Sequence, residues 1–179
     1  MISEFSVTAK PSNNKARHLF SLSLLLALAA TVVYVSIEHY RGLVGLVAAS
    51  FIVLAVYVFN RYMACVLHYD IMIDSEGIPL FVVRKTVGKR HTTLCRVELH
   101  TVISVTAESA QERRNRKTES GVIKYNYVPT LAPDLTYLVV TRSRYERAEI
   151  RIEVSEELAA LLREYAAEAR KTVADCDDE

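Results

Sequence analysis

Four cationic side chains lie within the six-residue stretch ERRNRK at positions 112–117, in a chain whose formal net charge is only +1. The four are Arg113, Arg114, Arg116 and Lys117. Each cation close to an anionic bilayer surface contributes on the order of 1 kcal/mol to binding. The stretch therefore predicts contact with anionic lipid headgroups. A solvated loop is the alternative, because Glu108 and Glu119 flank the cluster and Glu112 begins it, which partly cancels its charge.

Other residue types that carry chemistry do not form a recognisable catalytic or metal site. His91 and Cys95 share one face of an expected strand, but they would lie about 13 Å apart at ~3.3 Å per residue, and His100 has the opposite parity. The sequence has no nucleophile–base pair, no HExxH motif and no glycine-rich phosphate loop. We therefore expect no enzyme, no metal and no cofactor. Nucleic acid is also not expected, because no stacking aromatic residues interrupt the cationic cluster.

Tyr125 and Tyr127 share the same parity on an expected strand. Two interpretations stay open for them: they line a groove for a partner strand, or they pack in an aromatic core. The three cysteines, Cys65, Cys95 and Cys176, have no paired spacing, which argues against a disulfide framework.

Two uncharged apolar runs, Leu19–Ile37 and Gly42–Asn60, dominate the first third of the chain. At ~1.5 Å per residue each helix would reach roughly 28 Å, close to the hydrocarbon thickness of a bilayer. Neither run shows a polar stripe at helical spacing, so both are predicted to span a membrane. The stretch Ala27–Ala29 has the form of a signal-peptide cleavage site, but the apolar run continues past it to Ile37.

Basic residues flank the two predicted spans on the side of the chain termini. Lys10, Lys15 and Arg17 precede the first span, and Arg61 follows the second. The four residues between the spans, 38–41, have charges that cancel. The positive-inside bias therefore predicts a two-helix protein of the cell membrane with both termini in the cytoplasm. Neither span carries an ionisable residue that would mark a transport path.

Small residues on the second span predict close helix–helix packing. Gly42, Gly45 and Ala49 would allow another helix to approach its backbone. This feature supports the alternative that the chain forms a homo-oligomer in the membrane.

Beyond the spans, the apolar pattern changes to the period of two that is typical of strands. Seven strands are predicted, at 68–73, 79–87, 90–99, 102–106, 122–128, 135–142 and 148–154. Residues 108–120 lack apolar periodicity and are expected to form a loop. Ser155 is expected to cap a final helix with Glu156 and Glu157 in its first turn. An apolar stripe follows at helical spacing, formed by Leu158, Leu161, Leu162, Tyr165 and Ala169.

The expected organisation has four parts: a cytoplasmic N-terminal segment at 1–17, a transmembrane hairpin at 18–61 with helices at about 19–37 and 42–60, a cytoplasmic domain at 66–171 and a disordered acidic tail at 172–179. The fold class is a membrane α-hairpin with a mainly β, α+β domain. That domain is expected to be an antiparallel sandwich or barrel of about seven strands, closed by the C-terminal helix.

Three stretches carry a resemblance to a known group of proteins: HYDIMIDSEGIPLFVVRKTVG, RVELHTVISVTAE, and TYLVVTR with AEIRIEV and SEELAALLREYAAEA. In the order and spacing of its predicted helices and strands, the chain resembles small bacterial membrane proteins with a pleckstrin-homology-like domain, including the YcxB-like group. The resemblance covers most of residues 18–170. It implies a binding or assembly module and names no ligand.

We therefore expect a membrane-anchored, non-enzymatic interaction module that binds a protein partner or anionic lipid headgroups. Its expected partners are the bilayer and either another copy of the chain or another membrane protein. The alternatives are a homo-oligomeric structural or assembly protein of the membrane, or an accessory subunit of a membrane complex.

Overall fold

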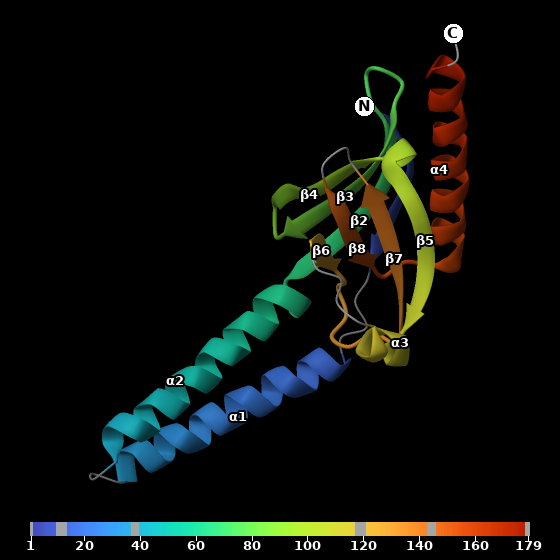
Figure 1. The fold of residues 1–179 in the computed structure, drawn as a ribbon. Helices are drawn as coiled ribbons and strands as arrows, with labels where there is room; N and C mark the ends of the chain where they lie inside the picture. The colour runs from blue at the N-terminus through green and yellow to red at the C-terminus, as the bar shows by residue number, and fades with distance from the viewer. Residues whose placement is uncertain (1, 10–13, 37–39, 117–120, 143–145, 178–179) are drawn as a thin grey trace. The chain divides into compact units, whose positions relative to one another are not determined.

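The computed structural model describes residues 2–9, 14–36, 40–116, 121–142 and 146–177, with the backbone alone at 2–4 and 173–177 (Figure 1). The chain divides into two compact units. Residues 11–65 form one unit, which we call the helical hairpin. Residues 1–10 and 66–179 form the other, which we call the β unit. The predicted N-terminal segment 1–17 is therefore shared between the two units instead of forming a separate part.

The helical hairpin consists of α1 (Asn14–Ser36) and α2 (Arg41–Val58), and α2 ends in a π-helical turn, η1 (Phe59–Met63). The helices Asn14–Ser36 and Arg41–Met63 are both long and apolar enough to cross a membrane. Within the hairpin, Ala27, Ala48 and Ala55 are buried, while large apolar side chains such as Leu46 are exposed. Small residues inside and large apolar residues outside are the distribution that suits a helix pair solvated by lipid.

The β unit contains two four-stranded sheets and a long helix. The first sheet has the order β1-β2-β3-β4, and the second has the order β5-β7-β8-β6. The strands of the first sheet are β1 (Ile2–Ala9), β2 (Cys65–Ile73), β3 (Pro79–Val87) and β4 (Arg90–Glu98). Those of the second are β5 (Val102–Ser109), β6 (Val122–Tyr127), β7 (Leu135–Arg142) and β8 (Arg147–Ile152). All seven predicted strands are present, and the class is α+β as predicted.

The first strand, β1, was not predicted. It pairs antiparallel with β2, with Ala9 opposite Leu67 and Val7 opposite Tyr69. The register shifts between Ser3 and Phe5, and such an irregularity breaks the period-two pattern by which strands are recognised. The β unit therefore begins before the helical hairpin, which is inserted in the chain between β1 and β2.

The second sheet is not purely antiparallel, which corrects the predicted antiparallel arrangement. Strand β6 pairs parallel with β8, while β7 pairs antiparallel with both β5 and β8. Because β6 lies at the sheet edge beyond β8, the chain must pass from β6 across to β7. Strand spacing along the sequence does not reveal such a crossing.

Residues 108–120 do not form the plain loop that was predicted. Strand β5 continues to Ser109, and the short helix α3 (Ala110–Asn115) follows. The Ser109 side chain accepts from the Glu112 amide and the Glu112 carboxylate accepts from the Ser109 amide, which is a capping box. The Ser-x-x-Glu spacing that signals this motif was present in the sequence. The loop prediction placed more weight on the missing apolar periodicity.

The last helix, α4, spans Glu156–Asp177. Ser155 precedes it as predicted, and its hydroxyl oxygen accepts from the Leu158 amide at 3.4 Å. The predicted apolar stripe is buried at Leu158, Leu162 and Ala169. The helix continues beyond residue 171, where a disordered tail was predicted, and residues 178–179 lie outside the described part.

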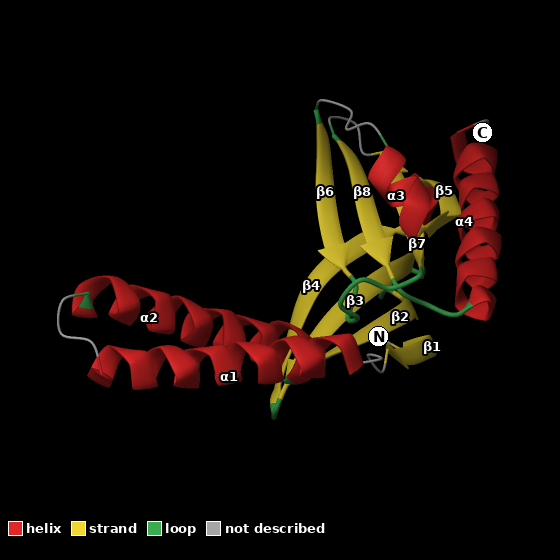
Figure 2. Ribbon diagram, turned by 90° about the horizontal axis from the view of Figure 1, so that it is seen from below, coloured by secondary structure: helices red, strands yellow, loops and turns green. Residues whose placement is uncertain are grey.

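The core of the β unit lies between the two sheets and α4. Tyr69 and Phe81 stack with their ring centroids 6.4 Å apart. The fully buried Tyr69 hydroxyl donates to the Tyr127 carbonyl at 2.6 Å and so links the first sheet to the second. Helix α4 runs beside β5, while β4 and β6 lie on the opposite side of the β unit (Figure 2). One side of the β unit is thus covered by a helix, and the other side presents two strand edges (Figure 2).

Candidate binding groove and the cationic residues

A hollow of about 330 Å³ lies between the edges of β4 and β6. We call it the β4–β6 groove. Its walls are Leu94, Cys95, Arg96 and Val97 from β4 and Tyr125 and Tyr127 from β6, and its floor is Thr141, Ala148 and Ile150. Both strands are the outermost of their sheets, and no further strand pairs with either in the described part of the chain. Two terminal strands therefore border an aromatic hollow.

Tyr125 and Tyr127 meet on one side of this groove. Tyr125 pairs with Ile150 and Tyr127 with Ile152, so both rings point to the face that carries the core residues of β8. The rings stack with centroids 6.0 Å apart, and Tyr125 is 40% exposed. The Tyr127 hydroxyl donates to the Leu94 carbonyl at 3.3 Å, across to the first sheet. Of the two interpretations from the sequence, the structure favours the groove, since the rings form its rim instead of the core.

Cys95 and Tyr127, two ionisable residues of the groove, are neutral near physiological pH. Burial raises the pKa of the Cys95 thiol, against a smaller opposing effect of its hydrogen bond with Tyr127. Burial, together with the proximity of Cys95 and Tyr125, raises the pKa of Tyr127 to about 12. A thiol with a raised pKa is a poor nucleophile. The groove thus offers apolar and aromatic surface with no activated group.

The candidate metal ligands are not brought together. His91 lies beside Thr86, with its Nδ1 2.9 Å from the threonine hydroxyl, while His100 lies next to Glu98 at 3.5 Å. Within the described ranges, no group of three or more His, Cys, Asp or Glu side chains could hold a metal ion.

The cations of ERRNRK differ in whether they bind other groups of the protein. Arg116 is 2.6 Å from Glu149 and 3.5 Å from Glu108, two carboxylates that are almost fully buried. Arg151 also binds Glu108, at 2.9 Å. We call these four residues the buried ion network. Burying an unpaired carboxylate costs several kcal/mol, so a buried carboxylate needs a cationic partner. Arg116 therefore stabilises the second sheet by pairing with Glu149 and Glu108.

Of the other cations in the stretch, one binds a backbone carbonyl and one is exposed to solvent. Arg113 donates from its guanidinium to the Pro133 carbonyl, and Arg114 is exposed. Lys117 lies outside the described residues. Two of the four predicted headgroup ligands therefore already bind protein oxygens.

A second buried carboxylate lies in the first sheet. Asp70 is 0% exposed, and its oxygens bind the Arg84 guanidinium at 2.6 Å and the Ser6 hydroxyl. The hydrogen bond with Asp70 raises the pKa of Arg84 further above its ordinary value. The contact joins β1, β2 and β3 and also helps to position the unpredicted first strand.

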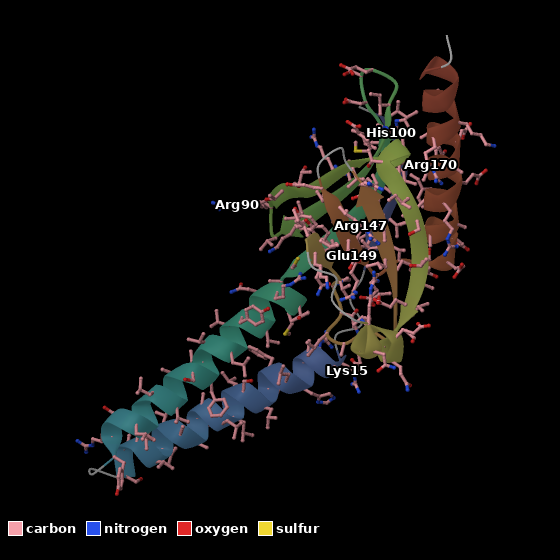
Figure 3. All side chains as sticks on the ribbon, in the orientation of Figure 1. Lys15, Arg90, His100, Arg147, Glu149 and Arg170 are labelled. Carbon is pink, nitrogen blue, oxygen red and sulfur yellow. The ribbon has the colours of Figure 1, made fainter. Side chains whose placement is uncertain are left out.

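The β3–β4 hairpin carries five cations in a run without carboxylates. From Pro79 to Val97 the sequence has no Asp or Glu, and its cations are Arg84, Lys85, Lys89, Arg90 and Arg96. Lys89, Arg90 and Arg96 are exposed, and Lys85 is half-buried. Figure 3 shows Arg90 at the end of this hairpin. The sequence interpretation did not single out these residues as a candidate site. The lack of carboxylates was the signal that could have singled them out.

A second hollow lies on the side of α4. It measures about 640 Å³ and is bordered by the β2–β3 turn at Gly77, by His100, and by Tyr165 and Glu168 of α4. His100 also borders a neighbouring hollow of about 520 Å³ with Arg142 and Arg170. The larger hollow carries the carboxylates Glu76 and Glu168, and the smaller one combines Glu98 with two arginines, so the two hollows together do not indicate one class of ligand.

The predicted packing residues of α2 do not share one environment. Gly45 lies against the Tyr34 ring of α1, where an added Cβ would be 3.4 Å from the ring. Gly42 has open space around it, and Ala49 is exposed, whereas Ala48 is buried in the hairpin. Gly45 therefore serves the pairing of α1 with α2, and Gly42 and Ala49 are left on the outer surface.

No protein-family model, no curated protein and no solved structure matches this chain. The resemblance to membrane proteins with a pleckstrin-homology-like domain therefore stays a prediction.

Proposed function

We propose that this chain is a membrane-anchored, non-enzymatic interaction module whose β unit binds a protein partner in the β4–β6 groove. The supporting observation is that β4 and β6, each the last strand of its sheet in the described part of the chain, lie beside the stacked rings of Tyr125 and Tyr127. Two helices of membrane-spanning length and hydropathy provide the anchor. Confinement to a membrane raises the effective concentration of the module toward neighbouring membrane partners, so a shallow groove suffices.

The proposed mode of binding is addition of an extended segment along β6. The outer edge of a terminal strand presents amide and carbonyl groups that a partner segment can pair with. Alternate side chains of that segment would enter the hollow between Tyr125 and Leu94. Aromatic residues at such positions give large contact area at low entropic cost, which makes Tyr125 the expected anchor of the interface.

An enzymatic role has no comparable support. The raised pKa values of Cys95 and Tyr127 keep these two side chains as a thiol and a phenol near neutral pH. We therefore assign the groove to recognition.

The test is site-specific photocrosslinking of the full-length chain in native membranes. A benzophenone amino acid at position 125 should form a discrete crosslinked species, and Leu94→Asp in the same chain should abolish it. The matched control places the same amino acid at Ile103, a 46% exposed residue of β5. Equal products from positions 125 and 103, or none from position 125, would contradict the proposal.

A homo-oligomeric assembly protein is the second candidate, supported by Gly42 and Ala49 on the outer surface of α2. Leucine at both positions should then remove crosslinked oligomers of the full-length chain in membranes. Gly45 is a poor test position, because leucine there would disturb the contact with Tyr34 within the hairpin. An unchanged oligomer ladder in the double variant would refute this candidate.

A further inference from the structure

We propose that the tip of the β3–β4 hairpin, formed by Lys85, Val87, Lys89 and Arg90, rests on the anionic surface of the bilayer that α1 and α2 span. The contact is distinct from the β4–β6 groove and does not depend on the proposed function. It rests on the two helices crossing a bilayer, which their length and hydropathy allow.

Charge is the first observation in favour of an anionic surface. The hairpin contains no carboxylate between Pro79 and Val97, whereas the whole chain is nearly neutral. Arg84 is neutralised by the buried Asp70, but the run that carries Lys85, Lys89 and Arg90 contains no carboxylate before Glu98, at the far end of β4. Such a concentration of one charge is stabilised by a surface of the opposite sign.

Geometry is the second observation. Val87 pairs with Arg90 and Lys85 pairs with Thr92, so these four side chains share one face of the hairpin. The turn is tight because Gly88 takes a φ of 59°, which places Lys89 at the end. Val87 is 39% exposed between the cations. An apolar side chain ringed by cations fits the boundary between headgroups and acyl chains.

Chain connectivity is the third observation. Strand β2 begins at Cys65, two residues after η1 ends at Met63. Since β2 and β3 are neighbours joined by a short turn at 74–78, the last residues of β3 lie at the end of the sheet where β2 begins. Ala9, opposite Leu67, leaves β1 at the same end, and residues 10–13 can bridge at most roughly 18 Å to Asn14. Both connections to the membrane helices therefore depart from the end of the sheet that carries the cationic tip.

The ERRNRK stretch is the obvious competitor for this role. In that stretch Arg113 binds the Pro133 carbonyl, and Arg116 binds Glu108 and Glu149. If Arg116 bound a lipid headgroup instead, the buried Glu149 carboxylate would lose this partner. The hairpin tip requires no such exchange. Arg114 provides a matched cation in the competing region.

The test uses the absence of tryptophan from the chain. Full-length Val87→Trp, reconstituted in nanodiscs, reports on its own depth by fluorescence. The discs contain phosphatidylcholine alone or with phosphatidylserine, each with a trace of lipid that bears a quenching nitroxide near the headgroup. We expect stronger quenching in the phosphatidylserine discs. The difference should vanish near ~1 M salt, where the Debye length falls to about 3 Å. Incorporation into the discs tests the membrane spans separately.

Three variants in the Val87→Trp background sharpen the result. Each of Lys85→Ser, Lys89→Ser and Arg90→Ser should weaken the contact about fivefold, because one cation is removed from the surface. Arg114→Ser should leave the quenching unchanged. A second reporter, Ile103→Trp on β5, should show no dependence on phosphatidylserine. The inference is overturned if quenching at position 87 is the same in both lipids or matches that at position 103. It is also overturned if the effect of phosphatidylserine persists when Lys85, Lys89 and Arg90 are all replaced by serine in one chain.

Discussion

Two cationic regions of the β unit, the ERRNRK stretch around α3 and the β3–β4 hairpin, look similar in sequence but have different roles in the structure. In the first, Arg116 pairs with Glu149 and Glu108, which are 5% exposed each. In the second, Lys89 and Arg90 are exposed within a run, residues 79–97, that contains no carboxylate. Cation density along the chain therefore does not show which cations are free to bind a ligand.

The difference follows from what the fold places beside each region. Glu149 is 33 residues from Arg116 in the chain, and β8 brings it to the end of α3. Arginine suits such a position, because its planar guanidinium can satisfy two carboxylates at once. The cations of the hairpin also differ from one another: Arg84 binds Asp70, while Lys89 at the turn is exposed.

The largest effect is expected within the hairpin. Arg84→Met should lower the free energy of unfolding of the β unit by about 3–5 kcal/mol, because Asp70 would be left buried without a cation. Lys89→Met, its matched control, should stay within about 0.5 kcal/mol. Pulse proteolysis of the full-length chain in detergent across a urea series measures both. Equal midpoints for the two variants would show that the Asp70 pair does not stabilise the fold.

A somewhat smaller loss is expected in the buried ion network. Arg116→Ser should cost about 2–4 kcal/mol, since Glu149 loses its partner while Glu108 keeps Arg151. Arg114→Ser should change stability by less than about 0.5 kcal/mol. The same urea series measures this pair. If Arg114→Ser were as destabilising as Arg116→Ser, the distinction between structural and free arginines of this stretch would fail.

The smallest effect is expected for an exposed carboxylate, Glu156 at the start of α4. Its pKa is lowered by the Tyr137 hydroxyl, which donates to it, and then by Arg163. A lowered pKa in the folded state means that the stabilisation is present at neutral pH and is lost as pH falls below 4.5 through the folded-state pKa. Tyr137→Phe should therefore reduce the loss of stability on acidification.

The control for this acid effect is Tyr125→Phe, which alters another tyrosine without a bond to Glu156. Urea midpoints at neutral and acid pH should differ less in Tyr137→Phe than in either wild type or Tyr125→Phe. An identical acid sensitivity in all three would contradict the role of the Tyr137–Glu156 contact.

Patterns that depend on near neighbours in the chain were predicted well. The seven strands from β2 to β8 and the cap of α4 at Ser155 follow from alternation and capping chemistry, and both membrane-length helices follow from uncharged runs. Strand β1 and helix α3 were not predicted, because their local signals were weak or conflicted with another signal. Strand β1 has an irregular register, and the capping box of α3 lay in a segment without apolar period.

The sequence by itself determined the apolar hairpin, the order of strands and the final helix, because each depends on residues within about one turn or one strand of each other. Only the tertiary structure decided that β1 joins β2, that β6 runs parallel to β8, and that Tyr125 faces a groove. It also decided that Arg116 meets Glu149. Pairing between distant segments depends on which partner buries more surface and satisfies more polar groups, and no local pattern records that choice.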